Sequence, residues 1–231
     1  MKERGMIFNG EMVRAILDGR KTQTRRPIKW KQTRFTEIGE REDGSKWPWS
    51  EDAEHACDFW HPCPFGAVGD RIWVREAYRF PASLDDVSPT GVGEMAVATG
   101  YRKPWAPTFY EFTGTFSDGW KGFETPPKVS DAGKLRPSIH MPRWASRILL
   151  EITNVRVERL NSIHDVDAMR EGIQNLTTCS HSDFGIPGVV NAQHPVRAFQ
   201  LLWESIYGAD SWRANPLVWV IEFKRVEGGA A

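Results

Sequence analysis

Apolar residues recur at helical spacing near the start of the chain. Residues 9–19, "NGEMVRAILDG", predict a short helix, because Asn9 can cap its first turn and Gly19 can end it. The apolar stripe of this helix consists of Met12, Val13, Ile16 and Leu17.

The same spacing returns twice in the last third of the chain. Residues 162–172 predict a short helix that starts with the capping-box pair Ser162 and Asp165. Residues 194–208, "HPVRAFQLLWESIYG", predict a longer helix. Its apolar stripe consists of Val196, Phe199, Trp203 and Ile206.

Alternation of apolar and polar residues predicts two strands, and a run that is at first apolar on both faces predicts a third. In "GDRIWVREAY" a glycine turn precedes a strand in which Glu76 falls on the more apolar face. The pattern is strongest in "RILLEITNVRVERL", where the phase slips near Thr153 and Asn154 and indicates a bulge. "PLVWVIEFKRV" predicts a closing strand.

Two long stretches, residues 29–65 and 81–135, show little periodicity. The first predicts an irregular tryptophan-rich loop, and the second holds possible strands at "EMAVATGY" and "TFYEFTGTF". Short, turn-bounded strands with a few helices favour an α+β domain, a small β-barrel with helices on its rim. We expect residues 1–231 to form one such domain, with the two stretches as insertions that cover the barrel mouth.

Composition changes this picture little. Thirty basic and thirty acidic side chains cancel, so any site for an anion must be local. Three cysteines argue against a disulfide framework. No stretch approaches the roughly 20 apolar residues of a membrane span, and the first residues lack a signal-peptide pattern. We therefore expect a cytoplasmic protein without a membrane partner.

The segment "GRKTQTRRP", residues 19–27, concentrates positive charge around two threonines. It has three interpretations: a solvated basic turn, a grip on an anionic substrate, or a nucleophile with its base. The last requires Lys21 and Thr24 to converge, which a regular strand would not allow. Neighbouring arginines and burial would both lower the pKa of Lys21 and so make it a better base.

Five sequence blocks together resemble the ASCH domain family. They are "ILDGRKTQTRR", "GDRIWVRE", "ITNVRVERL", "DAMREGI" and "VWVIEFKRV", within residues 6–28, 66–80, 136–173 and 194–226. The resemblance is greatest to the longer ASCH proteins of bacteria and their phages. It implies a PUA-like β-barrel with flanking helices.

One branch of that family comprises amidohydrolases that deacetylate N(4)-acetylcytidine. The resemblance implies that Thr24 is the nucleophile, Lys21 the base and Glu171 the acid that protonates the leaving amine. It also implies that these three residues share one pocket. Other members of the family are described as RNA-binding and some as nucleases.

Further residues are candidates for substrate binding. Each also has an ordinary structural interpretation as an ion pair, a solvated charge or part of a packed turn. A cation beside an aromatic ring, as in "HMPRW" with His140, can hold a base or a phosphate. The candidates are Arg20, Arg25, Arg26, Arg75, Glu76, Arg143 and Trp144.

The segment "HACDFWHPC" holds four side chains that are able to bind zinc. Its spacing is unfamiliar and crowded for one tetrahedral ion, and loop residues without metal are the other interpretation. We therefore assign no metal and no other cofactor. The four are His55, Cys57, His61 and Cys63, which Cys179 and His181 could complete.

Together these observations favour an amidohydrolase that acts on an acylated cytosine nucleoside or a related modified base. Two alternatives stay open: a non-catalytic RNA-binding module, and a metal-dependent ribonuclease. The expected partner is accordingly a modified nucleoside or RNA.

Overall fold

The computed structural model describes residues 1–30, 34–51, 58–117, 127–178 and 181–226. The chain divides into two compact units. Unit 1 comprises mainly Asp18–Asp70 and Glu151–Lys224, and unit 2 mainly Lys2–Leu17 and Arg71–Leu150. Each unit has its own buried apolar cluster.

Three strands form the centre of unit 1. Strand β14 (Leu217–Arg225) lies between β10 (Leu149–Arg159) and β2 (Gln23–Pro27). Strands β14 and β2 are antiparallel, with Val220 opposite Arg25. Strand β10 confirms the prediction from "RILLEITNVRVERL", although its first two residues belong to unit 2.

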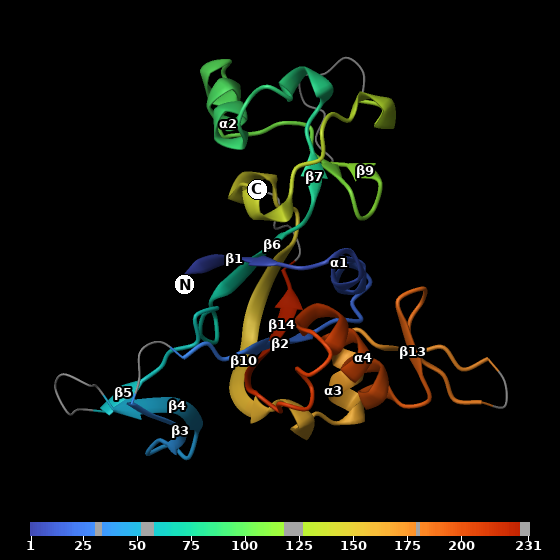
Figure 1. The fold of residues 1–231 in the computed structure, drawn as a ribbon. Helices are drawn as coiled ribbons and strands as arrows, with labels where there is room; N and C mark the ends of the chain where they lie inside the picture. The colour runs from blue at the N-terminus through green and yellow to red at the C-terminus, as the bar shows by residue number, and fades with distance from the viewer. Residues whose placement is uncertain (31–33, 52–57, 118–126, 179–180, 227–231) are drawn as a thin grey trace. The chain divides into compact units, whose positions relative to one another are not determined.

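Helices α3 (Asp165–Arg170) and α4 (Pro195–Tyr207) pack on one face of this sheet (Figure 1). Both helices were predicted, but the capping box was not correct: His164 precedes α3 and no side chain caps it. A small antiparallel sheet packs against α4, formed by β11 (Gln174–Asn175), β12 (Phe184–Ile186) and β13 (Val190–Ala192). Buried residues of this cluster include Leu160, Ile173, Phe199, Leu202, Val218 and Val220.

The first insertion is more regular than its sequence indicates. It contains a three-stranded antiparallel sheet of β3 (Arg34–Glu40), β4 (Lys46–Glu51) and β5 (Asp58–Trp60). The prediction of an irregular loop was therefore wrong for these strands. Gly39 explains part of the difference, because it leaves room for the Trp60 ring, which a side chain there would meet.

Unit 2 begins with β1 (Glu3–Ile7), which pairs in parallel with β6 (Arg71–Arg75). Helix α1 (Gly10–Leu17) follows as predicted, and the side chain of Asn9 accepts a hydrogen bond from the Met12 backbone at 2.9 Å. The predicted alternation in the next block holds, since Ile72, Val74, Glu76 and Tyr78 are all buried.

The second insertion contains helix α2 (Pro89–Ala98) and strands β8 (Phe109–Tyr110) and β9 (Thr115–Phe116). Strand β8 pairs with β7 (Tyr78–Arg79), which ends just before the insertion. The strand predicted at "EMAVATGY" is therefore wrong, because most of it lies in α2. Ser88 caps this helix and Pro89 occupies its first turn. Both residues favour a helix start, and this local signal outweighs the β-branched residues that follow.

Taken together, the fold is mixed α/β, with about 26% helix and 32% strand. Among the described residues, the sheets do not close into a barrel. None of the helices in those residues is both long and apolar enough to cross a membrane.

Tyr78 offers a test of the core of unit 2. It is fully buried, its hydroxyl donates to the His140 carbonyl oxygen at 2.9 Å, and burial raises its pKa to about 12. The folded state therefore keeps the Tyr78 proton at pH values above 10.0, the ordinary pKa of tyrosine. The stabilising effect of the protonated hydroxyl is lost as the pH rises through about 12. We expect Tyr78→Phe to remove a component near pH 12 from the ultraviolet titration of tyrosinate. An unchanged titration would contradict this placement of Tyr78.

Candidate polar site around Lys21

The basic segment is buried. Lys21, Gln23, Thr24 and Arg25 are each at most 3% exposed. Most of the segment forms β2, which pairs with β14, so its backbone hydrogen bonds are made within a sheet. A solvated basic turn is therefore excluded as an interpretation of this segment.

The ammonium group of Lys21 has three acceptors. Its Nζ donates to the Glu171 carboxylate (Oε2, 2.7 Å), the Glu171 backbone oxygen (2.9 Å) and the Gln23 backbone oxygen (2.8 Å). All three ammonium hydrogens are thus used. Glu171 directly follows α3, and Gly172 then turns the chain with φ of 111°. Side chains 150 residues apart in sequence form this buried ion pair.

Burial lowers the pKa of Lys21 from its ordinary value of 10.5. The Glu171 carboxylate opposes this shift, and the positive charges of Arg26 and Arg25 add to it. Burial and the neighbouring arginines thus both act in the direction predicted from the sequence. A lysine with a lowered pKa is a better proton acceptor near neutral pH.

Arg25 holds the other oxygen of the same carboxylate. Its Nη1 donates to Glu171 Oε1 at 3.3 Å and also to the side-chain oxygen of Gln23. Its Nη2 donates to Glu158 and Asp167, each at 3.2 Å. The Glu171 carboxylate is therefore shared between a lysine and an arginine that are both fully buried.

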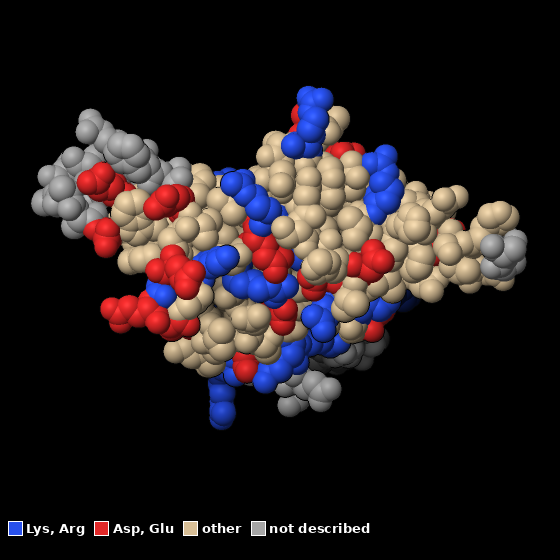
Figure 2. Space-filling model, turned by 90° about the horizontal axis from the view of Figure 1, so that it is seen from below, with Lys and Arg blue, Asp and Glu red and all other residues tan. Residues whose placement is uncertain are grey.

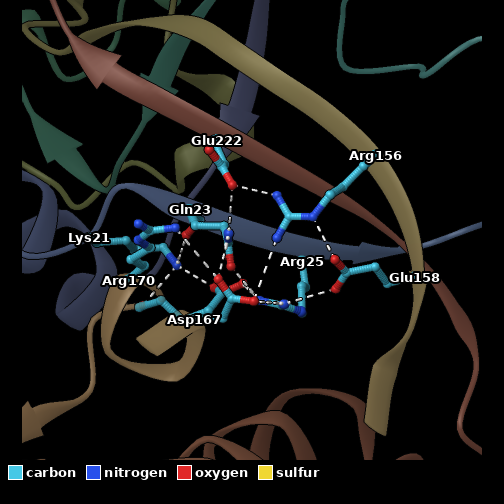
Figure 3. A network of polar contacts seen from close by, with 9 residues as sticks. Lys21, Gln23, Arg25, Arg156, Glu158, Asp167, Arg170 and Glu222 are labelled. Atoms are coloured by element: carbon cyan, nitrogen blue, oxygen red, sulfur yellow. Dashed lines mark hydrogen bonds and ion pairs between the residues drawn. The ribbon is translucent and has the colours of Figure 1, made fainter. Parts of the chain in front are cut away.

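A second layer of charges continues from Arg25 (Figure 3). Arg156 of β10 bonds to Glu158 and Glu222 and lies 3.6 Å from Asp167. The Gln23 amide nitrogen donates to Asp167 and Glu222, each at 3.2 Å. These outer carboxylates and Arg156 are partly exposed, so the cluster runs from a buried end at Lys21 towards solvent.

Thr24 is buried but lies on the other face of β2. Gln23 and Arg25 point towards Glu171 and Asp167, and side chains alternate along a strand. Thr24 accordingly shares its face with Arg26, opposite Ile221 and Trp219 of β14. Among the described residues, no hydrogen bond joins the Thr24 hydroxyl to Lys21 or Glu171. The structure thus brings together two of the three residues that the family resemblance implies.

The remaining basic residues of the segment, Arg20 and Arg26, have contacts outside this cluster. Arg20 donates to the backbone oxygen of Gly172 at 3.3 Å and to Asp18 at 2.8 Å. Arg26 is half-buried opposite Trp219. Trp219 in turn contacts Trp47 of β4, with ring centroids 5.3 Å apart, so the first insertion contacts the Thr24 face of the sheet at this point.

The other candidates for substrate binding belong to unit 2 and have protein partners there. Glu76 is 1% exposed and forms a two-pronged ion pair with Arg147, with both distances 2.9 Å. The Arg147 guanidinium also lies 3.9 Å from the centre of the Tyr110 ring. Arg75 lies over Trp73. Glu76 thus behaves as the buried half of an ion pair with Arg147.

Arg143 and Trp144 also contact other residues. Arg143 donates to Glu3 at 2.7 Å. Trp144 stacks on Phe80, with ring centroids 5.5 Å apart and planes at 6°. These contacts correspond to a packed turn.

Three of the potential zinc ligands, His55, Cys57 and Cys179, lie outside the described residues. Within the described part, no group of three potential ligands comes together. His61 instead contacts the Ser50 hydroxyl at 2.8 Å and packs edge-on against Phe59, and burial lowers its pKa. Cys63 is buried and is not in a disulfide.

The residues of the second layer were not predicted from the sequence. A signal for them existed: the charged pairs in "NVRVER" and "VIEFKR" place charges at alternate positions of strands whose other residues are apolar. Charged residues on a strand face that a helix covers need partners. The missed residues are Gln23, Arg156, Glu158, Asp167 and Glu222.

A comparison with known proteins finds no matching family model, no similar curated protein and no similar solved structure. Inference about the site therefore depends on its own residues and geometry.

The buried ion pair between Lys21 and Glu171 should contribute measurably to stability. We expect Lys21→Met and Glu171→Leu each to lower the free energy of unfolding by about 3–5 kcal/mol, because each leaves a buried charge without its partner. The double variant should cost less than the sum of the two. Urea unfolding of the four proteins measures this, and strictly additive losses would show that the two charges do not interact.

The lowered pKa of Lys21 predicts a pH dependence with a definite sign. Between the folded value and 10.5, the unfolded chain binds the lysine proton more readily, so stability rises with pH through this window. We expect the wild type to gain more stability than Lys21→Met/Glu171→Leu between neutral pH and pH 10.5. The free energy of unfolding is measured by urea unfolding at each pH. An equal change with pH in the two proteins would refute the lowered pKa of Lys21.

Proposed function

We propose that this protein is an amidohydrolase that removes the acyl group from an acylated cytosine nucleoside or a related modified base. We also propose that it is an ASCH-type protein whose sheet is related to the PUA-like β-barrel. The observation that carries the first proposal is the buried contact between Lys21 and Glu171. These two residues lie in the "GRKTxT" and "DAMREGI" blocks that motivated the resemblance.

The contact is chemically suited to amide hydrolysis. One proton transfer along the 2.7 Å hydrogen bond converts the ammonium–carboxylate pair into a neutral amine and a carboxylic acid. Burial lowers the pKa of Lys21, which favours the neutral amine. The amine is then a base for the attacking hydroxyl group, and the acid is a donor for the amine that leaves the substrate. Two groups with opposite tasks are thereby prepared at one place.

Two groups are candidates for the nucleophile that attacks the acyl carbon: the Thr24 hydroxyl and a water molecule. For Thr24 to attack, its hydroxyl must come within hydrogen-bond reach of Lys21, yet its side chain leaves β2 on the other face. A water molecule activated by Lys21 is the other route, and it requires room beside an ion pair that is buried and fully bonded to protein groups. Thr24→Val keeps the shape of the side chain and removes the hydroxyl, so it separates these two routes.

A non-catalytic RNA-binding role has less support from the same residues. Lys21 and Arg25 are buried and neutralised by carboxylates, so they offer little charge to a phosphate. Figure 2 shows basic and acidic side chains interspersed on the face in view. This arrangement is unlike the continuous basic surface that is typical of nucleic-acid binding. The ribonuclease alternative depends on a metal cluster, and three of its six potential ligands lie outside the described residues.

The test is to incubate the purified protein with acylated cytosine nucleosides and to follow release of the free nucleoside by chromatography. We expect Lys21→Arg and Glu171→Gln to lose about a hundredfold or more in turnover, because arginine is not a base and glutamine is not an acid. Lys224→Arg is the matched control, since Lys224 is exposed and should tolerate the change.

Absence of turnover by folded wild type on every acylated cytosine nucleoside would refute the proposed reaction. Full activity of Lys21→Arg would remove the lysine from the mechanism. Thr24→Val assigns the nucleophile: loss of turnover with an intact fold identifies Thr24, and retained turnover identifies water.

A further inference from the structure

Among the carboxylates of the cluster in Figure 3, Asp167 contacts the most side chains. Its Oδ2 accepts from Arg25 and its Oδ1 from the Gln23 amide, each at 3.2 Å. Ion pairs also join it to Arg156 at 3.6 Å and to Arg170 at 3.8 Å. Its side chain is 14% exposed. One carboxylate of α3 thus contacts side chains from both β2 and β10.

The backbones of Asp167 and Glu171 are joined by a hydrogen bond from the Glu171 nitrogen to the Asp167 oxygen at 2.9 Å, but within the described residues their carboxylates are connected through other side chains. The two are four positions apart, so they lie on the same side of the helix and its end. Both contact Arg25, whose Nη2 donates to Asp167 and whose Nη1 donates to Glu171. Gln23 adds a second connection, because it donates to Asp167 and accepts from Arg25. Rotation of Arg25 away from Glu171 would therefore break contacts at Asp167.

We propose that Asp167 is a positioning residue, which holds Arg25 and Gln23 so that the Glu171 carboxylate stays shared between Arg25 and Lys21. Its importance for turnover rests on the proposed function. The electrostatic effect on Lys21 does not, since it follows from the charges alone.

The electrostatic effect has a predictable sign. Asp167→Asn removes a negative charge and leaves Arg25 less compensated. Arg25 can then bind Glu171 more tightly, in competition with Lys21. Both changes disfavour the ammonium form, so the pKa of Lys21 should fall further below its ordinary value. The charged groups around Lys21 come from every element of the cluster. They are Arg20 before β2, Arg25 and Arg26 of β2, Asp167, Arg170 and Glu171 of α3 and its end, Arg156 and Glu158 of β10, and Glu222 of β14.

The experiment measures Lys21 directly. The protein is labelled with ¹³C at the lysine Cε, the Lys21 resonance is assigned by its loss in Lys21→Arg, and its titration is followed by NMR. We expect Asp167→Asn to lower the midpoint by about one pH unit. Asp165→Asn is the matched control, because it makes the same change at an exposed position of the same helix and should leave the midpoint in place.

An unchanged Lys21 midpoint in folded Asp167→Asn overturns the proposal. Should that variant fail to fold, Glu158→Gln replaces it, because Glu158 contacts Arg25 from β10 and its loss should move the midpoint in the same direction. An unchanged midpoint there would likewise overturn it.

Turnover gives an independent readout. We expect the basic limb of the pH–rate profile of Asp167→Asn to shift together with the NMR midpoint. A lower rate with an unshifted profile would mean that Asp167 is merely structural, against the proposal. If the wild type shows the NMR behaviour but deacylates nothing, the proposed function fails and the positioning of Lys21 by Asp167 stands.

Discussion

The burial of Lys21 is the constraint on which unit 1 depends. Moving an ammonium group out of water costs several kcal/mol, and attraction to a partner offsets this only when the remaining donors are also satisfied. The structure meets both conditions, with one carboxylate and two carbonyl oxygens around Nζ. Arg25 is buried beside it and brings the same requirement. The two cations explain why so many carboxylates converge here.

The cluster as a whole is close to neutral. Lys21, Arg25, Arg156 and Arg170 carry four positive charges, and Glu158, Asp167, Glu171 and Glu222 carry four negative ones. Such balance lets charged groups occupy the space between a sheet and a helix without a large net field. It also makes the group cooperative, because removal of one member leaves several partners uncompensated.

The same requirement shapes the backbone near the site. Thr22 donates its backbone hydrogen to the Arg170 oxygen at 2.9 Å, and the Thr22 oxygen accepts from Phe223 of β14. The turn before β2 is thereby tied both to the end of α3 and to the sheet. Glu171 must end the helix at this point for its own backbone oxygen to reach Lys21. Gly172, with its positive φ, then allows the chain to turn away.

Unit 2 also buries charged side chains, and it compensates them with fewer groups. Glu76 is buried on the apolar face of its strand region, as the alternation predicted, and one arginine satisfies both of its oxygens. The Arg147 guanidinium gains further contact from the face of Tyr110. Arg136 is also buried there, and it donates to three backbone oxygens of the second insertion. Buried charge in this unit therefore fixes loops in place, whereas in unit 1 it forms a connected cluster.

Local pattern by itself was enough for the elements whose apolar residues give a strong periodic or continuous signal. Helices α1 and α4 and strands β10 and β14 follow from it, since hydrophobic periodicity depends only on near neighbours. The pairing of Lys21 with Glu171 came from the family resemblance, because no local rule connects residues 150 positions apart. Tertiary structure decided the rest. Pairing with β14 makes residues 23–27 a regular strand, and this regularity sends Thr24 to the face opposite Arg25. The convergence of Asp167, Arg156 and Glu222 likewise depends on helix and strands meeting in space, which only the assembled core determines.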